Sequence, residues 1–178
     1  FLMTTFLKNR DMKFSFHLLL ACIALTACGE SGKMTADYRI VPCPGEIAPG
    51  DGGDFELDAR TRIICTGDND GMRANAEFLA GYVESVIGSA PEITGPDGLC
   101  DDGRAVILRA DAPGKGGEAY EIEVSENRIT VSGESDAGVF YGIQTLRKAM
   151  GAAKAAKVLF PAVRIADEPY LGYRGVML

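Results

Sequence analysis

Residues 135–150 read SDAGVFYGIQTLRKAM, and their apolar residues recur at spacings of four, three and four residues. Such spacing predicts an amphipathic helix with a single apolar stripe. Either Ser135 or Asp136 can cap this helix, because a short side-chain oxygen accepts hydrogen bonds from the free N–H groups of the first turn. The stripe consists of Val139, Ile143, Leu146 and Met150.

Two glycines interrupt this helix on one face. Gly138 and Gly142 are four residues apart and therefore lie one above the other. Each glycine costs a helix about 1 kcal/mol relative to alanine. We therefore expect a neighbouring element to approach the helix backbone closely at this face, and plain helix packing is the simplest reason for such an approach.

The residues around this helix predict a second helix and several short strands. A helix is predicted over Gly71–Ile87, and Gly88 is well placed to end it. Its apolar stripe consists of Met72, Ala76, Leu79, Val83 and Ile87. Glu126 and Asn127 can form a tight turn between Tyr120–Ser125 and Arg128–Val131, which predicts a hairpin. The other predicted strands are Tyr38–Pro42, Phe55–Leu57, Thr61–Cys65, Arg104–Ala110 and Pro161–Glu168, the last of which is stopped by Pro169.

This order of elements predicts an α+β fold. Two helices set between runs of strands favour a mostly antiparallel sheet layered with two helices, and about 125 residues are enough for one core. After this core, Tyr173–Leu178 is typical of the start of a buried strand. We therefore expect the chain to be the front part of a longer protein.

The first 28 residues are typical of an export signal. Met12-Lys13 is a plausible start, and Phe14–Leu25 has the length of the apolar region of a signal peptide. Leu25-Thr26-Ala27-Cys28-Gly29 resembles a bacterial lipobox, in which the Cys28 thiol receives the lipid anchor. The alternative is an ordinary signal peptide that contains a cysteine. Residues 29–37 are polar and are predicted to form a flexible tether.

Composition excludes several kinds of active site. The only histidine, His17, lies within the predicted signal, so neither a Ser-His-Asp triad nor an imidazole metal site is expected in the exported part. The formal net charge of −7 argues against nucleic acid as a partner. Glu121 and Glu123 alternate with apolar residues, so they are predicted to form the wet face of a strand and not a catalytic pair.

Three cysteines remain after the predicted signal: Cys43, Cys65 and Cys100. An exported chain can form disulfides, but three cysteines cannot all pair with one another. Two arrangements remain open: one disulfide bridge with one free thiol, or a disulfide to a cysteine elsewhere in a longer protein. For Cys65, which lies in an apolar strand, a buried free thiol is the simplest interpretation.

Four segments of the chain resemble the N-terminal region of family 20 glycoside hydrolases, the β-N-acetylhexosaminidases. The segments are Ala119–Val124, Gly138–Leu146, Pro161–Ile165 and Tyr173–Leu178, and their order and spacing match as well. The resemblance implies that residues 38–166 form the zincin-like accessory domain, whose sheet covers two helices that lie against a (β/α)8 barrel. Residues 167–178 would then begin that barrel. No His-Glu-x-x-His motif is present, so neither zinc nor another cofactor is expected.

The resemblance also implies an activity. Family 20 enzymes hydrolyse terminal β-linked N-acetylglucosamine or N-acetylgalactosamine with retention, using the acetamido group of the substrate itself. The catalytic Asp and Glu of the family come from a later barrel strand, so no catalytic residue is expected up to Leu178. Arg174 matches the family arginine that binds sugar hydroxyls at the non-reducing end. The alternative role for Arg174 is an ion pair at the mouth of the barrel.

Two further interpretations remain open. This region could be a non-catalytic module that associates with a glycan-active partner, or the accessory domain of a family 84 or family 67 glycosidase. If the chain is the front part of a hexosaminidase, its expected partners are an amino-sugar glycan, the missing barrel and a lipid anchor at Cys28. Because Gly29 is not the aspartate that commonly retains lipoproteins at the inner membrane, we expect the outer membrane as the location.

Overall fold

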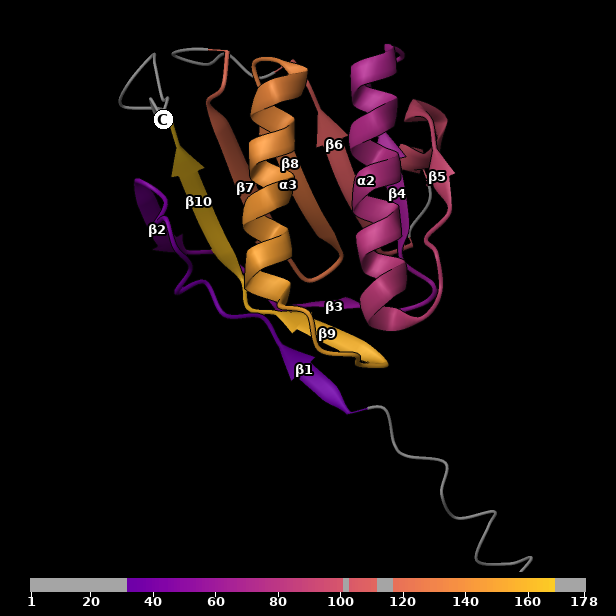
Figure 1. The fold of residues 1–178 in the computed structure, drawn as a ribbon, viewed down its shortest axis with the longest axis vertical. Coiled ribbons are helices and arrows are strands. Elements are labelled where there is room, and N and C mark those ends of the chain that lie inside the picture. Colours follow the sequence, from indigo (N-terminus) through magenta and orange to yellow (C-terminus); the bar gives the residue numbers. More distant parts are fainter. Residues whose placement is uncertain (1–31, 101–102, 112–116, 169–178) are drawn as a thin grey trace, which may run out of the picture. The chain divides into compact units, whose positions relative to one another are not determined.

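The computed structural model describes residues 32–100, 103–111 and 117–168, with residues 99 and 100 described by their backbone alone. Its main feature is a seven-stranded sheet (Figure 1). In spatial order the strands are β2 (Glu46–Pro49), β10 (Val163–Asp167), β7 (Tyr120–Ser125), β8 (Arg128–Gly133), β6 (Ala105–Arg109), β4 (Arg62–Cys65) and β5 (Ile93–Thr94).

This sheet is mixed. Strands β2, β10, β7 and β8 pair antiparallel, and the predicted hairpin over Tyr120–Ser125 and Arg128–Val131 is confirmed. From β8 through β6 and β4 to β5, each pairing is parallel. The α+β class is therefore confirmed, whereas the mostly antiparallel sheet holds for one half only. The helix after β4 is the physical reason, because it carries the chain back so that the next strands run parallel to β4.

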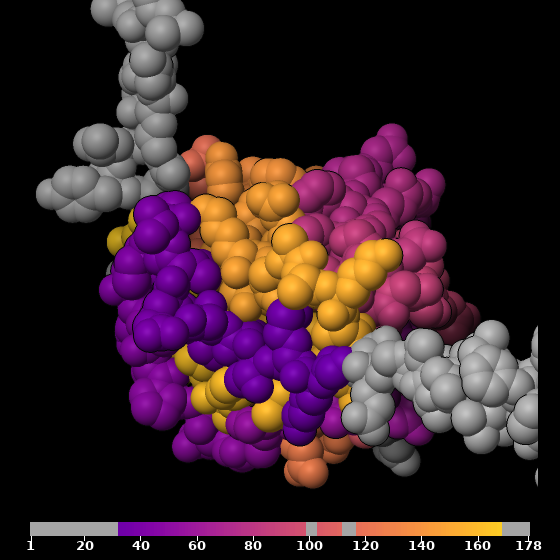
Figure 2. Space-filling view, turned by 60° about the horizontal axis from the view of Figure 1, so that its bottom comes forward, coloured from indigo at the N-terminus to yellow at the C-terminus, as the bar shows by residue number. Residues whose placement is uncertain are grey.

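A smaller sheet closes one end of the domain. Its strands lie in the order β1 (Lys33–Thr35), β9 (Lys157–Phe160) and β3 (Phe55–Leu57). β1 pairs with β9 across more than a hundred residues of sequence, and Figure 2 shows these N-terminal and C-terminal segments side by side. Residues 33–35 were predicted to belong to the tether, so this prediction is wrong for them. The predicted strand Tyr38–Pro42 is also wrong, since those residues lack regular structure.

Two helices cover one face of the large sheet (Figure 1): α2 (Asp70–Ile87) and α3 (Asp136–Met150). Asn69 caps α2 by accepting a 2.7 Å bond from the Met72 N–H, and Gly88 ends it with φ of 85°. Ser135 caps α3 as predicted, since its Oγ accepts from the N–H groups of Ala137 and Gly138.

The core lies between these helices and the sheet. Both predicted apolar stripes are buried, except that Ile87 at the end of α2 is only partly buried. Facing them, the apolar residues of β7 and β8 point inward at every second position. On the other face of the sheet, a second buried cluster of Ile64, Ala105 and Ile107 lies close to the 3-10 helix η1 (Pro96–Cys100).

The glycines of α3 face this sheet. A Cβ at Gly142 would lie 2.5 Å from Val131 Cγ1, and a Cβ at Gly138 would collide with the carbonyl oxygen of Ala119. The expected close approach is therefore made by β7 and β8. It lets α3 pack onto the hairpin at a distance that larger residues would not allow.

Candidate functional site

The carboxylates that most resemble a catalytic pair lie on the open face of the sheet. Glu121 and Glu123 point away from the helices and are exposed, as predicted. Glu121 lies 3.7 Å from the guanidinium of Arg164 on the neighbouring strand β10. An exposed pair of this kind contributes little to stability and forms no cleft. These residues are surface groups.

The two predicted site residues lie outside the described residues. Arg174 was predicted to bind sugar, and Cys28 to carry a lipid anchor. Both remain predictions, since the described part of the chain begins at residue 32 and ends at residue 168.

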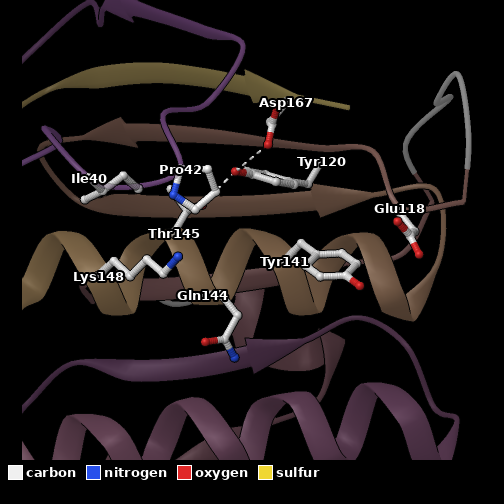
Figure 3. A pocket seen from close by; sticks show the side chains of 9 residues that line it. All are labelled: Ile40, Pro42, Glu118, Tyr120, Tyr141, Gln144, Thr145, Lys148 and Asp167. Carbon is white, nitrogen blue, oxygen red and sulfur yellow. Dashed lines mark hydrogen bonds between the residues drawn. The ribbon is translucent and has the colours of Figure 1, made fainter. Parts of the chain in front are cut away.

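One pocket lies beside α3, where this helix meets the ends of β7 and β10 (Figure 3). Its volume is about 90 Å³, whereas ligand sites usually have about 300–1,000 Å³. That volume suits a few water molecules and not a sugar ring. The lining residues are Ile40, Pro42, Glu118, Tyr120, Tyr141, Gln144, Thr145, Lys148 and Asp167.

A chain of hydrogen bonds runs through the wall of this pocket. The Tyr120 hydroxyl lies 2.6 Å from Thr145 Oγ1 and donates to Asp167 Oδ2 at 3.4 Å, which Figure 3 shows as a dashed line. The other oxygen of Asp167 accepts a 3.1 Å bond from the Gly45 N–H. The network therefore joins α3, β7, the end of β10 and the loop before β2.

The electrostatics of this network keep the tyrosine neutral. Burial raises the pKa of Tyr120 to about 12, and the nearby Asp167 carboxylate adds to this rise, while the Thr145 hydroxyl opposes it. A general base needs a pKa near the working pH. With this raised pKa, the Tyr120 hydroxyl stays protonated at neutral pH and links Thr145 to Asp167.

A second polar cluster joins the two sheets. Glu56 on β3 accepts a 2.8 Å bond from Lys157 Nζ on β9 and a 3.1 Å bond from Arg104 beside β6. These two bonds, first that of Lys157 and then that of Arg104, lower the pKa of Glu56 below its usual value. Arg104 also lies 3.5 Å from the buried Asp58 carboxylate. The cluster fixes the small sheet against the large one.

Aromatic side chains gather on the outward surface of the helices. Phe78 of α2 lies 5.6 Å from Phe140 of α3, and Phe140 lies 5.9 Å from Tyr141, measured between ring centroids. All three are at least 36% exposed. No role was predicted for Phe78, Phe140 or Tyr141, although their spacing on the polar side of both helices is visible in the sequence.

Among the described residues, no group of three or more His, Cys, Asp or Glu side chains could hold a metal ion. In the same part of the chain, no helix is long and apolar enough to cross a membrane. Cys43 and Cys65 are free, and the buried Cys65 thiol donates to the Gly67 carbonyl, as predicted for a buried thiol.

Known proteins are similar to this chain in sequence and in fold. The family model described as "Glycosyl hydrolase family 20, domain 2" matches residues 37–168, which is most of the chain. The chain belongs to glycosyl hydrolase family 20. A β-hexosaminidase of Porphyromonas gingivalis is 30% identical over 93% of the chain and 22% of its own length. A β-N-acetylhexosaminidase of Cellulomonas fimi is 28% identical over 80% of the chain and 28% of its own length.

Solved structures of family 20 agree with the fold. The β-N-acetylhexosaminidase of Streptomyces coelicolor A3(2) superposes with a TM-score of 0.66 at 23% identity, over 77% of this chain and 28% of that one. A family 20 β-N-acetylglucosaminidase is 33% identical, with a TM-score of 0.53 over 78% of this chain and 24% of that one. This family 20 chain thus spans about a quarter of the length of its relatives. The resemblance to family 20 is confirmed.

Proposed function

We propose that this chain is the accessory domain of an exported β-N-acetylhexosaminidase, which removes terminal β-linked N-acetylglucosamine or N-acetylgalactosamine. The family match over residues 37–168 carries this proposal. The chain matches 22% and 28% of the length of two hexosaminidases, so these relatives are several times as long. The described residues hold no catalytic constellation, which fits an accessory domain.

The proposed chemistry takes place in a barrel outside this chain. The acetamido oxygen of the substrate attacks the anomeric carbon, and the bond from that carbon to the leaving oxygen breaks. An Asp of the barrel orients the acetamido group, and a neighbouring Glu protonates the leaving oxygen. The attack closes a ring between the acetamido group and the anomeric carbon. Water then attacks that carbon and breaks its bond to the acetamido oxygen, so the product retains the configuration of the substrate.

Two residues of this chain have proposed roles in the longer protein. Arg174 would bind hydroxyls of the terminal sugar, since a planar fork of donors suits two adjacent oxygens. A hydroxyl held in this way cannot carry another sugar, which would restrict the enzyme to chain ends. Cys28 would carry the lipid anchor, with the outer membrane as the proposed location.

Hydrolysis of p-nitrophenyl N-acetyl-β-glucosaminide tests the proposal. The longer polypeptide that contains this sequence should be active, and the 178-residue chain alone should be inactive. Arg174→Ala should abolish most of the activity, whereas the control Arg164→Ala should not, because Arg164 is an exposed arginine on the outer face of the sheet. A folded but inactive longer polypeptide would instead favour a non-catalytic module.

A further inference from the structure

One stretch of this acidic chain contains basic residues only. The chain has 25 acidic and 18 basic residues, yet no Asp or Glu lies between Asp136 and Asp167. The basic residues of this stretch are Arg147, Lys148, Lys154, Lys157 and Arg164. Arg147 and Lys148 lie in the last turn of α3, where the helix dipole favours cations, and Arg164 lies beside Glu121. Lys154 and Lys157 follow the helix and need another explanation.

The small sheet brings a third lysine to the same place. Lys33 is the register partner of Lys157 in the parallel pairing of β1 with β9, so the two side chains share one face of this sheet. All three lysines are exposed, and Figure 2 shows the end of the domain where β1 and β9 meet. Like charges side by side on neighbouring strands repel one another. Lys33 and Lys154 have no ion-pair partner within the described part of the chain.

The carboxylates closest to these lysines are balanced by arginines. Glu56, which bonds to Lys157, also accepts a 3.1 Å bond from Arg104, and Asp58 accepts a 3.0 Å bond from Arg60. Two arginines therefore offset the charge of two carboxylates. The three lysines remain as an excess of positive charge at this end of a chain whose formal net charge is −7.

Two other acidic residues lie at the opposite end of the small sheet. Asp37 follows β1 and pairs with Arg39 at 2.7 Å. Asp54 precedes β3, whose first residue is paired with Phe160, at the far end of β9 from Lys157. The length of a strand therefore separates both acids from the lysines.

The lysines lie close in sequence and in space to the proposed lipid anchor. Cys28 precedes Lys33 by five residues. Five residues reach at most about 18 Å when fully extended. The field of an anionic surface extends about 10 Å at 0.1 M ionic strength. A membrane that holds Cys28 can therefore meet this end of the domain within the range of its charge.

We propose that Lys33, Lys154 and Lys157 form a basic surface that binds the phosphate groups of anionic phospholipids and so determines which end of the domain faces the membrane. The inference rests on the proposed function in one respect, namely that Cys28 carries a lipid anchor. Each lysine near an anionic membrane strengthens binding about fivefold. The anchor supplies a high effective concentration, while the acidic remainder of the chain is repelled.

Acetylation rates of single lysines measure this contact. Residues 29–178 contain the whole described core, and a hexahistidine tag in place of residues 1–28 tethers them to vesicles that carry a nickel-chelating lipid. The vesicles consist of phosphatidylcholine alone, or with one third phosphatidylglycerol. On the anionic vesicles, Lys33, Lys154 and Lys157 should be acetylated at least threefold more slowly than on the neutral ones, as quantified by tandem mass spectrometry. An Arg109→Lys reporter at the far end of β6 from Arg104 should react equally on both.

Charge variants test whether the lysines cause the contact. With Lys33→Gln and Lys154→Gln combined, the acetylation rate of Lys157 should become nearly equal on the two kinds of vesicle. The matched control combines Arg73→Gln with Arg164→Gln, which removes the same charge from two exposed arginines elsewhere. In this control, Lys157 should still react more slowly on anionic vesicles. Raising sodium chloride to about 0.5 M should abolish the difference in the unmodified chain, because salt screens the charges.

Three results would overturn the proposal. The first is equal acetylation of the three lysines on neutral and anionic vesicles. The second is slowing that persists at high salt or extends to the Arg109→Lys reporter, which would indicate crowding by the bilayer. The third is equal slowing by inorganic phosphate without vesicles, which would indicate a site for a free anion.

Failure of this proposal can be distinguished from failure of the proposed function. The mass of the chain made in a bacterium shows whether Cys28 is lipidated, and an unlipidated Cys28 refutes both the anchor and the membrane contact. A lipidated chain whose lysines react equally on both kinds of vesicle refutes the basic surface alone. A longer polypeptide that does not hydrolyse the substrate refutes the hexosaminidase function and leaves the membrane contact intact.

Discussion

Gly142→Ala tests the close packing of α3 on the hairpin. The new methyl group would lie 2.5 Å from Val131 Cγ1 and 3.3 Å from Tyr120 Cδ2, whereas carbon atoms normally stay about 3.5–4.0 Å apart. Val131 is fully buried, so it cannot move away freely. Overpacking of this kind costs about 1–3 kcal/mol. The gain in helix propensity offsets about 1 kcal/mol.

The expected result is a net loss of about 1 kcal/mol in the free energy of unfolding, which lowers the unfolding temperature by about 2–4 °C. Gly81→Ala is the control, because it adds the same propensity without a contact and should stabilise by about 1 kcal/mol. The difference between the two variants isolates the packing cost. Urea unfolding of the 178-residue chain, followed by circular dichroism, measures both. Equal stabilisation by both substitutions would refute the packing argument.

Two other predictions concern the polar clusters. Tyr120→Phe should destabilise the chain by about 1–2 kcal/mol, because it leaves the buried Thr145 hydroxyl without this partner. Because the chain has six tyrosines, the titration of Tyr120 is obtained by subtracting the ultraviolet titration of Tyr120→Phe from that of the wild type. This difference should have its midpoint near pH 12, and a midpoint near pH 10 would contradict the burial of Tyr120. Glu56→Gln should make the free energy of unfolding depend less on pH in the acid range. Because the pKa of Glu56 is lowered in the folded chain, its contribution to the free energy of unfolding is complete above about pH 4.5 and is lost as the pH falls through the lowered pKa. Urea midpoints measured from pH 6 to pH 3 test this. If the midpoints of the wild type and Glu56→Gln change with pH by the same amount, the bonds of Glu56 to Lys157 and Arg104 are excluded.

Local sequence patterns were sufficient to predict an element where one hydrophobic period runs through the whole of it. The stripes of α2 and α3, the end of α2 at Gly88 and the β7–β8 hairpin were predicted within a residue or two, and Ser135 was one of the two predicted caps of α3, whereas the Asn69 cap of α2 was not predicted. The edge strands β1, β2 and β5 were not predicted, because β1 and β5 have three and two residues and β2 lies among prolines and glycines. β3 was predicted although it also has three residues, because its two apolar residues flank a charged one. β9 was missed for a similar reason, since its four residues follow a run rich in alanine and lysine.

The residues of the candidate site also fall into two groups, those predicted from the sequence and those that only the structure brings together. The resemblance to family 20 supplied Arg174, the lipobox-like motif supplied Cys28, and both stay predictions. The Tyr120 network could not be predicted, because its three side chains come from β7, α3 and β10 and only the sheet register brings them together.

The sequence by itself determined the two amphipathic helices, the hairpin and membership of family 20, because each depends on residues near one another in the chain. Only the tertiary structure decided that half of the sheet is parallel and that residues 33–35 pair with β9. It also separated two kinds of helix glycine that look alike in the sequence. Gly142 is required by a neighbour inside the domain, whereas Gly81 faces open space, and the difference depends on contacts between distant segments.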